Sequence, residues 1–194
     1  MPAFLCALLL AAAPVWGYTG GLVRAELLGY EPSERRVYYQ LKAYDESGDA
    51  PRVFFFDLAG SAPAVPVRAA DLEQPDAFHS TPEVSKRQYR LEEHLVALPM
   101  VHSMATMTAG WDSLRIDPVW ERPVYAFRVA LQKDGIRGAH ADTAYCSPLF
   151  RQIAAYRIPG RQEEIAVLSF IGRAYGCEPV QLPVLLVPSG KRAK

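Results

Sequence analysis

His140 and Asp142 are the pair whose types and spacing best suit acid–base or metal chemistry. On a β-strand, residues two apart point the same way, so the imidazole and the carboxylate can share a proton or a metal ion. Both chemistries need a further partner, which the sequence does not identify. A polar strand face or loop is the simpler interpretation, and we predict no catalytic, cofactor-binding or metal-binding residue. A hydrolase or metal-dependent enzyme with a site around His140 and Asp142 stays the alternative.

Cys146 and Cys177 are the two cysteines outside the first seventeen residues, which hold Cys6. An even pair in an exported protein most simply forms a disulfide, and here only one pairing exists. The closed loop of roughly 30 residues corresponds to about 3 to 4 kcal/mol in the chain-entropy treatment. We therefore predict a disulfide, with two buried thiols as the alternative.

The acidic bend DESGDAP has Asp45, Ser47 and Asp49 at the first, third and fifth positions of a calcium loop. An EF-hand loop also needs Gly at its sixth position and Glu at its twelfth. Ala50 and Phe56 occupy those positions, so the calcium interpretation fails. Gly, Asp and Pro are residues that reverse the chain direction, and the bend is predicted to be a hairpin turn.

Two tryptophans with neighbouring carboxylates suggest one more possible site. Asp112 and Asp117 stand near Trp111 and Trp120, and stacking aromatics beside carboxylates suit carbohydrates. The spacing does not establish that these four side chains converge. Core and surface roles are the simpler expectation.

Recognised catalytic motifs are absent from the sequence. It contains no GxSxG, SxxK, HExxH, Walker A or GxGxxG pattern. Lysine plus arginine and aspartate plus glutamate both number 21, so the formal net charge is zero and no nucleic-acid partner is predicted. Half of the residues are hydrophobic, which indicates a folded chain.

The first seventeen residues, MPAFLCALLLAAAPVWG, have the pattern of a signal peptide. Their apolar run is shorter than the roughly 20 residues that span a bilayer, so no transmembrane segment is expected after leader removal. An uncleaved anchor and a misassigned start are the alternatives. We predict a signal peptide at 1–17, one globular domain at 18–188 and a basic flexible tail at 189–194. The mature protein is expected to be periplasmic or secreted.

The elements that must position these residues are mostly strands. Alternation over 37–44 and the apolar run 53–56 predict a hairpin, and 65–68 a short edge strand. Ser80 as a cap, Pro82 in the first turn and one apolar face reaching Leu98 predict an amphipathic helix that ends before Pro99.

The second half of the chain contains four further predicted strands. They cover 122–132, 149–158, 164–171 and 180–187, with turns at Lys133-Asp134-Gly135 and Pro159-Gly160 and an edge or bulge at Pro183. Strands that follow one another as hairpins, with one strong helix, define an α+β fold. It is a mostly antiparallel β-sheet built of hairpins with one amphipathic covering helix.

Three stretches resemble a bacterial family of predicted secreted proteins of unknown function. They are LLGYEPSERRVYYQLKAYDESGDAPRVFFFDL, YCSPLFRQIAAYRI and IAVLSFIGRAYGCEPVQLPVLLV. The first is similar to that family's opening, where a GF-S-DG-RY motif precedes a hairpin ending in an aromatic-rich DL. The resemblance implies secretion and the order of the elements. It implies no catalytic residue, because none is established for the family.

Together these features predict a non-catalytic binding or structural module of the bacterial cell envelope. Its partner is expected to be a protein or glycan of the envelope, and no cofactor is expected.

Overall fold

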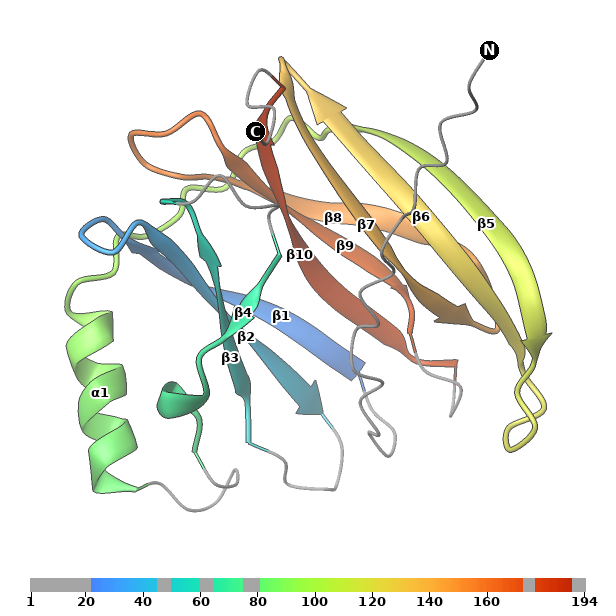
Figure 1. Ribbon diagram of the computed structural model, residues 1–194, viewed down its shortest axis with the longest axis horizontal. Helices are drawn as coiled ribbons and strands as arrows, with labels where there is room; N and C mark the ends of the chain where they lie inside the picture. Colours follow the sequence, from blue (N-terminus) through green and yellow to red (C-terminus); the bar gives the residue numbers. More distant parts are fainter. Residues whose placement is uncertain (1–21, 45–49, 60–64, 75–80, 173–176, 190–194) are drawn as a thin grey trace, which may run out of the picture.

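The computed structural model describes residues 22–44, 50–59, 65–74, 81–172 and 177–189 (Figure 1). Its elements are β1 (Leu22–Glu31), β2 (Arg36–Tyr44), β3 (Arg52–Asp57), β4 (Val67–Arg68), the 3-10 helix η1 (Ala70–Leu72), α1 (Pro82–Glu92), β5 (Thr106–Ile116), β6 (Pro123–Lys133), β7 (Ile136–Tyr145), β8 (Phe150–Arg157), β9 (Glu164–Ile171) and β10 (Pro179–Pro188). The predicted leader and residues 190–194 of the predicted tail lie outside the described residues.

The strands form one ten-stranded sheet in the order β4-β3-β2-β1-β10-β7-β6-β5, with β8 and β9 added beside β10. Every described strand pair is antiparallel except β1 with β10, which meet in parallel at Val23 and Val180. The predicted α+β class, with a mostly antiparallel sheet and a single helix among the described residues, is confirmed.

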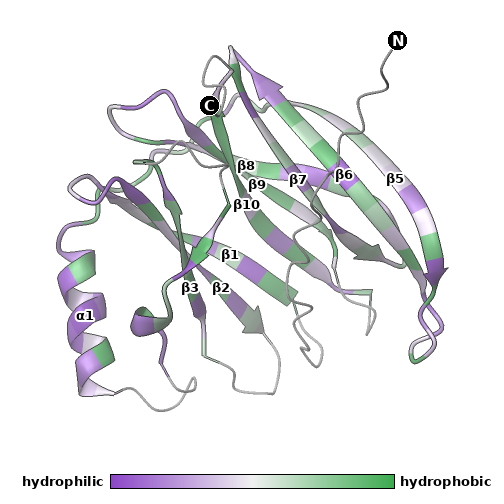
Figure 2. Ribbon diagram, in the orientation of Figure 1, coloured by the Kyte–Doolittle hydropathy of each residue, from purple (hydrophilic) through white to green (hydrophobic). Residues whose placement is uncertain are grey.

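Strand β9 is buried on both faces, which explains its nearly continuous apolar sequence. Leu168 and Phe170 belong to a cluster with buried residues of β6, β7 and β10. Ile165 belongs to a second cluster that contains Tyr39 and Phe56 of the β2–β3 hairpin. Strands β9 and β10 thus contribute residues to both clusters, and hydrophobic residues run along these strands (Figure 2).

The predicted hairpins are present. Strands β2 and β3 pair from Arg36–Asp57 to Leu41–Arg52, so the chain reverses between them, although Asp45 to Asp49 lie outside the described residues. Asp134 and Gly135 have φ angles of 45° and 81°, the positive values that a tight hairpin turn requires.

Pro183, predicted at an edge or bulge, lies within β10 and opposite Val167 of β9. The pairs that β10 forms with β1 and β7 involve Val180, Val187 and Pro188. On the side of β10 away from β9, no described strand pairs with Pro183. The missing N–H of the proline therefore leaves no strand carbonyl on that side without its donor.

Three strands form where the sequence predicted none: β1, β5 and β7. The segments 106–116 and 136–145 lie outside the predicted strand ranges, although a strand face was one interpretation of His140 and Asp142. Both segments pair with β6 over most of their length. Strand β1 pairs with β2 along its length and contains an irregularity between Leu27 and Gly29.

The predicted helix forms, but it is shorter than expected. It begins at Pro82 after Thr81, whose side chain makes no capping bond, while the Thr81 N–H donates to Gln74 Oε1. The predicted cap, Ser80, lies outside the described residues. The helix ends at Glu92, so Leu98 is not part of it.

Helix α1 covers only one part of the sheet. No residue of α1 is fully buried. Leu91, and Leu95 beyond the helix end, pack against a buried cluster that includes Tyr38, Val53 and Leu72. The helix thus lies over η1 and the β2–β3 hairpin (Figure 1) and leaves the rest of the sheet uncovered by it.

The predicted pairing of Cys146 and Cys177 is confirmed at disulfide distance, with Cα atoms 5.8 Å apart. Cys146 follows β7 and Cys177 precedes β10, so the bond joins the start of β10 to the β5–β7 part of the sheet. Within the described residues, no helix is long and apolar enough to cross a membrane.

Candidate functional site

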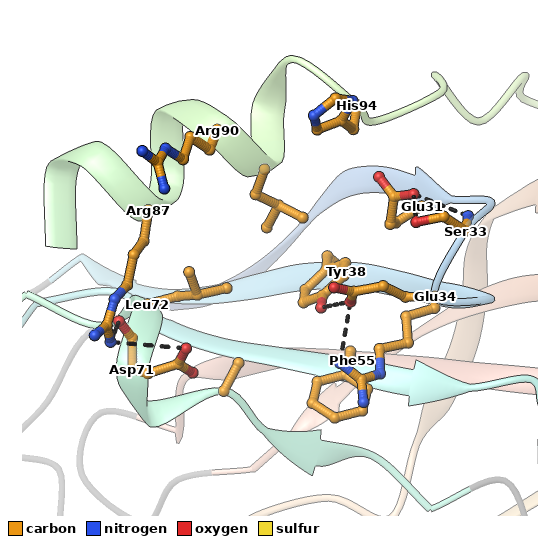
Figure 3. Close-up of a pocket in the computed structure, with 13 residues that line it drawn as sticks. Glu31, Ser33, Glu34, Tyr38, Phe55, Asp71, Leu72, Arg87, Arg90 and His94 are labelled. Carbon is orange, nitrogen blue, oxygen red and sulfur yellow. Dashed lines mark hydrogen bonds and ion pairs between the residues drawn. The ribbon is translucent and has the colours of Figure 1, made fainter.

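A cavity of about 340 Å³ lies where α1 passes over the β2–β3 hairpin (Figure 3). Its walls are formed by α1 with the turn that follows it, by the turn that joins β1 to β2, and by η1. Its floor is formed by side chains of β2 and β3. Four segments that are distant in sequence therefore meet at one site.

The helical wall presents side chains spaced as one face of a helix requires. Arg87 and Leu91 are four residues apart, and so are Arg90 and His94, which places all four on neighbouring positions of one side. Arg87 reaches toward Asp71 of η1, with a separation of 3.9 Å between Nη1 and Oδ2. Arg90 forms no ion pair with any described residue and is exposed.

The floor is aromatic and rigid. Tyr38 and Phe55 stand directly opposite each other in the β2–β3 ladder, with ring centroids 5.5 Å apart. The Tyr38 hydroxyl donates a 2.6 Å hydrogen bond to Glu34 Oε2. Burial, followed by this bond to Glu34, raises the pKa of Tyr38 to about 12, so the phenol stays protonated at neutral pH.

Arg36 closes one side of the floor. Its Nη1 lies 3.0 Å from Glu34 Oε2, and its guanidinium carbon lies 4.4 Å from the centre of the Phe55 ring. Glu34 is thus engaged by two donors, Arg36 and Tyr38. The Arg36 guanidinium therefore already covers one face of the Phe55 ring. A ligand in the cavity would contact the side chains around this ring more than the ring itself.

Glu31 provides the acidic wall at the turn between β1 and β2. The residue is only 5% exposed, and its Oε1 accepts bonds from the Ser33 N–H at 2.9 Å and the Ser33 hydroxyl at 2.7 Å. The Ser33 hydroxyl bond, which outweighs the opposing effect of burial, lowers the pKa of Glu31. Oε2 accepts no bond from a described residue, and His94 lies across from the carboxylate (Figure 3).

His140 and Asp142 point the same way on β7, as the sequence predicted. Their side chains are 3.3 Å apart between Nε2 and Oδ2, and both are partly exposed. They share the strand face of their β6 neighbours Val129 and Phe127. Among the described residues, no group of three or more His, Cys, Asp or Glu is arranged to hold a metal ion.

The tryptophan and aspartate residues of the possible carbohydrate cleft have separate roles. Trp111 packs edge-on against Tyr125, with centroids 5.4 Å apart. Asp112 is the next residue of β5 and so points to the opposite face. Asp117 Oδ1 accepts the N–H groups of Val119 and Trp120 and stabilises the turn before β6. These carboxylates do not form one site.

The pocket was not predicted from the sequence. The predicted helix was expected to reach Leu98, whereas His94 follows the helix end in an exposed turn. The spacing of Arg87, Leu91 and His94 was the available signal. It indicates a mixed polar and apolar face, which is unusual for a helix that only covers a core.

Comparisons of the chain with models of protein families, with curated proteins and with solved structures found no match. What the pocket can bind therefore follows from its own residues.

Proposed function

We propose that the protein is an exported, non-catalytic binding module of the bacterial cell envelope, and that the pocket under α1 is its binding site. The observation that carries this proposal is a cavity of about 340 Å³ whose lining combines apolar side chains, among them Leu72 and Leu91, with charged ones. Recognition pockets generally combine apolar surface for affinity with a few polar groups for orientation.

The bonding within the pocket supports binding rather than catalysis. Glu34 is held by Arg36 and Tyr38, and the Ser33 hydroxyl donates to Glu31. The raised pKa of Tyr38 and the lowered pKa of Glu31 fix both groups in their ordinary ionisation states at neutral pH. A general acid or base instead needs a pKa near the working pH.

Export is supported by two independent features. The Cys146–Cys177 pair lies at disulfide distance, and disulfides persist mainly in oxidising compartments. The first seventeen residues carry the pattern of a signal peptide, and the resemblance to a family of secreted bacterial proteins agrees with it. A protein or glycan of the envelope is the partner class that fits this location.

Filling the pocket tests the proposal. A panel of small neutral and charged compounds is screened against ¹⁵N-labelled protein, and we expect some of them to shift amide signals of β2, β3 and α1. Leu91→Trp adds bulk inside the pocket and should abolish these shifts. Tyr89→Trp, at a helix position that is 63% exposed and outside the pocket, is the matched control and should keep them. Shifts that survive in the folded Leu91→Trp protein would refute this site.

The second candidate function is a hydrolase or metal-dependent enzyme around His140 and Asp142. It rests on the 3.3 Å contact between their side chains. We expect no hydrolysis of p-nitrophenyl esters or phosphates above the blank, with or without added Zn²⁺. Turnover that disappears in both His140→Ala and Asp142→Ala, while their circular dichroism stays unchanged, would favour the enzyme.

A further inference from the structure

We infer, on the basis of the proposed function, that the pocket takes a small zwitterion: a ligand with an amino group at one end, an acidic group at the other and an apolar body between them. Amino acids and short peptides are this chemical class. The inference rests on two charged side chains from different segments of the pocket lining, Glu31 and Arg90, each with bonding capacity that no described residue uses.

The acidic end of the pocket is Glu31. Its side chain is almost fully covered, yet only Oε1 is used by Ser33, and Oε2 has no hydrogen-bond donor among the described residues. The lowered pKa keeps the carboxylate charged at neutral pH. An ammonium group would donate a charge-assisted hydrogen bond to Oε2.

The basic end is the helical wall. Arg90 has no ion-pair partner in the described part of the chain, and its residue is exposed. Arg87 is engaged by Asp71, since its Nη1 lies 3.9 Å from Asp71 Oδ2 and donates to the Asp71 backbone oxygen at 3.5 Å. A ligand carboxylate can accept from the Arg90 guanidinium, which offers several N–H donors in a planar fork.

A ligand with one sign of charge fits this pocket less well. Three arginines and three carboxylates line it, so its formal charge is zero with His94 neutral. A simple anion would meet the unpaired oxygen of Glu31, and a simple cation would meet Arg90. Only a ligand that carries both signs can satisfy both walls at once.

The middle of the ligand must be apolar and small. Leu91 of α1 and Leu72 of η1 both line the cavity between the two charged walls. Arg36 already covers the Phe55 ring, which leaves these leucines as the main apolar contact. A volume of about 340 Å³ is at the low end for ligand pockets and suits an amino acid or a dipeptide.

The probes are alanyl-leucine, its N-acetyl derivative and its C-terminal amide, titrated into the full chain by calorimetry and by NMR. The N-acetyl form lacks the ammonium group, and the amide lacks the carboxylate. We expect the zwitterion to bind about tenfold or more tightly than either derivative, since each loses one charge-assisted bond. Shifted amides should belong to β2, β3 and α1.

Two variants test which residue binds each end of the ligand. Glu31→Gln keeps an oxygen for Ser33 and should remove the preference for a free amino group while keeping the preference for a free carboxylate. Arg90→Gln, at an exposed position, should do the reverse. A merely structural role for either residue would weaken all three probes equally, and that result would overturn the inference.

The outcomes separate the inference from the proposed function. If the three probes bind equally, or bind outside the pocket, while other compounds of the panel bind in it, the zwitterion is excluded and the binding site stands. If nothing in the panel or among the probes shifts pocket amides, both are wrong.

Discussion

Gly29 allows the chain after α1 to approach strand β1. A Cβ at this position would lie 2.9 Å from Leu95 Cβ and 3.0 Å from the Val96 carbonyl oxygen, and its φ of 152° is one that side chains rarely adopt. Tyr30 and Val96 exchange backbone hydrogen bonds of 2.9 and 2.8 Å beside it. One glycine therefore fixes the position of the segment that carries His94 and Leu95.

We predict that Gly29→Ala lowers the free energy of unfolding by about 1 to 3 kcal/mol, because the new methyl group overpacks this contact. Urea denaturation measures the loss. Gly110→Ala is the control, since a Cβ there meets nothing within 4 Å and its backbone is ordinary strand. Equal midpoints for the two variants would show that β1 and the 95–96 segment are not in close contact.

Ser33 controls the ionisation of Glu31. Because the folded pKa of Glu31 is lower than its unfolded value of 4.5, the stabilisation is present above that value. It is lost as the pH falls through the folded pKa. We predict that Ser33→Ala costs about 1 kcal/mol at neutral pH.

The difference between wild type and Ser33→Ala should shrink below pH 4.5 as Glu31 becomes protonated. Urea midpoints of both proteins at neutral and acidic pH measure it. A gap that widens in acid would contradict the assigned role of Ser33.

At the level of single residues, the sequence identified local relations and missed distant ones. The His140–Asp142 contact follows from the alternation of side chains along a strand. The cysteine pairing follows because only two cysteines remain after the predicted leader. The pocket joins Glu31 to Arg90 across nearly sixty positions, and only the folded sheet brings them together. No local pattern encodes such a meeting.

At the level of elements, strands with one buried face were predictable and the others were not. Strand β6 alternates between buried and exposed residues and was found. Strand β5 is exposed along almost its whole length, so it has no apolar alternation. Strand β7 carries Gly138, His140 and Asp142 on its inward-facing side, which hides its period, and the irregularity at Leu27 and Gly29 interrupts that of β1.

Strand β9 offers the sharpest test of the arrangement, since its two faces belong to different cores. We predict that Leu168→Ala and Ile165→Ala each cost about 2 to 5 kcal/mol, as truncations of fully buried side chains do. Gln132→Ala, on the exposed side of β6, should stay within about 0.5 kcal/mol of wild type. Denaturant midpoints measure all three. A mild effect of either β9 variant would mean that only one face of the strand is packed.

Across the molecule, the pocket and the disulfide lie in different parts of the chain. Every residue lining the pocket lies between positions 31 and 94, whereas the disulfide joins positions 146 and 177. The two parts meet along β1, β9 and β10. Loss of the disulfide should therefore lower the stability of the fold without changing any contact inside the pocket.

Reduction of the Cys146–Cys177 bond should lower the free energy of unfolding by about 3 to 4 kcal/mol, because a 31-residue loop no longer restricts the unfolded chain. Urea denaturation with and without reductant measures this. The double variant Cys146→Ala/Cys177→Ala should match the reduced protein and should not respond to reductant. Compounds that shift pocket amides in the oxidised protein should bind the folded double variant with unchanged affinity. A disulfide that stabilises the fold and leaves the pocket alone is useful only where thiols are oxidised, so a wild-type midpoint that ignores reductant would remove the structural argument for export.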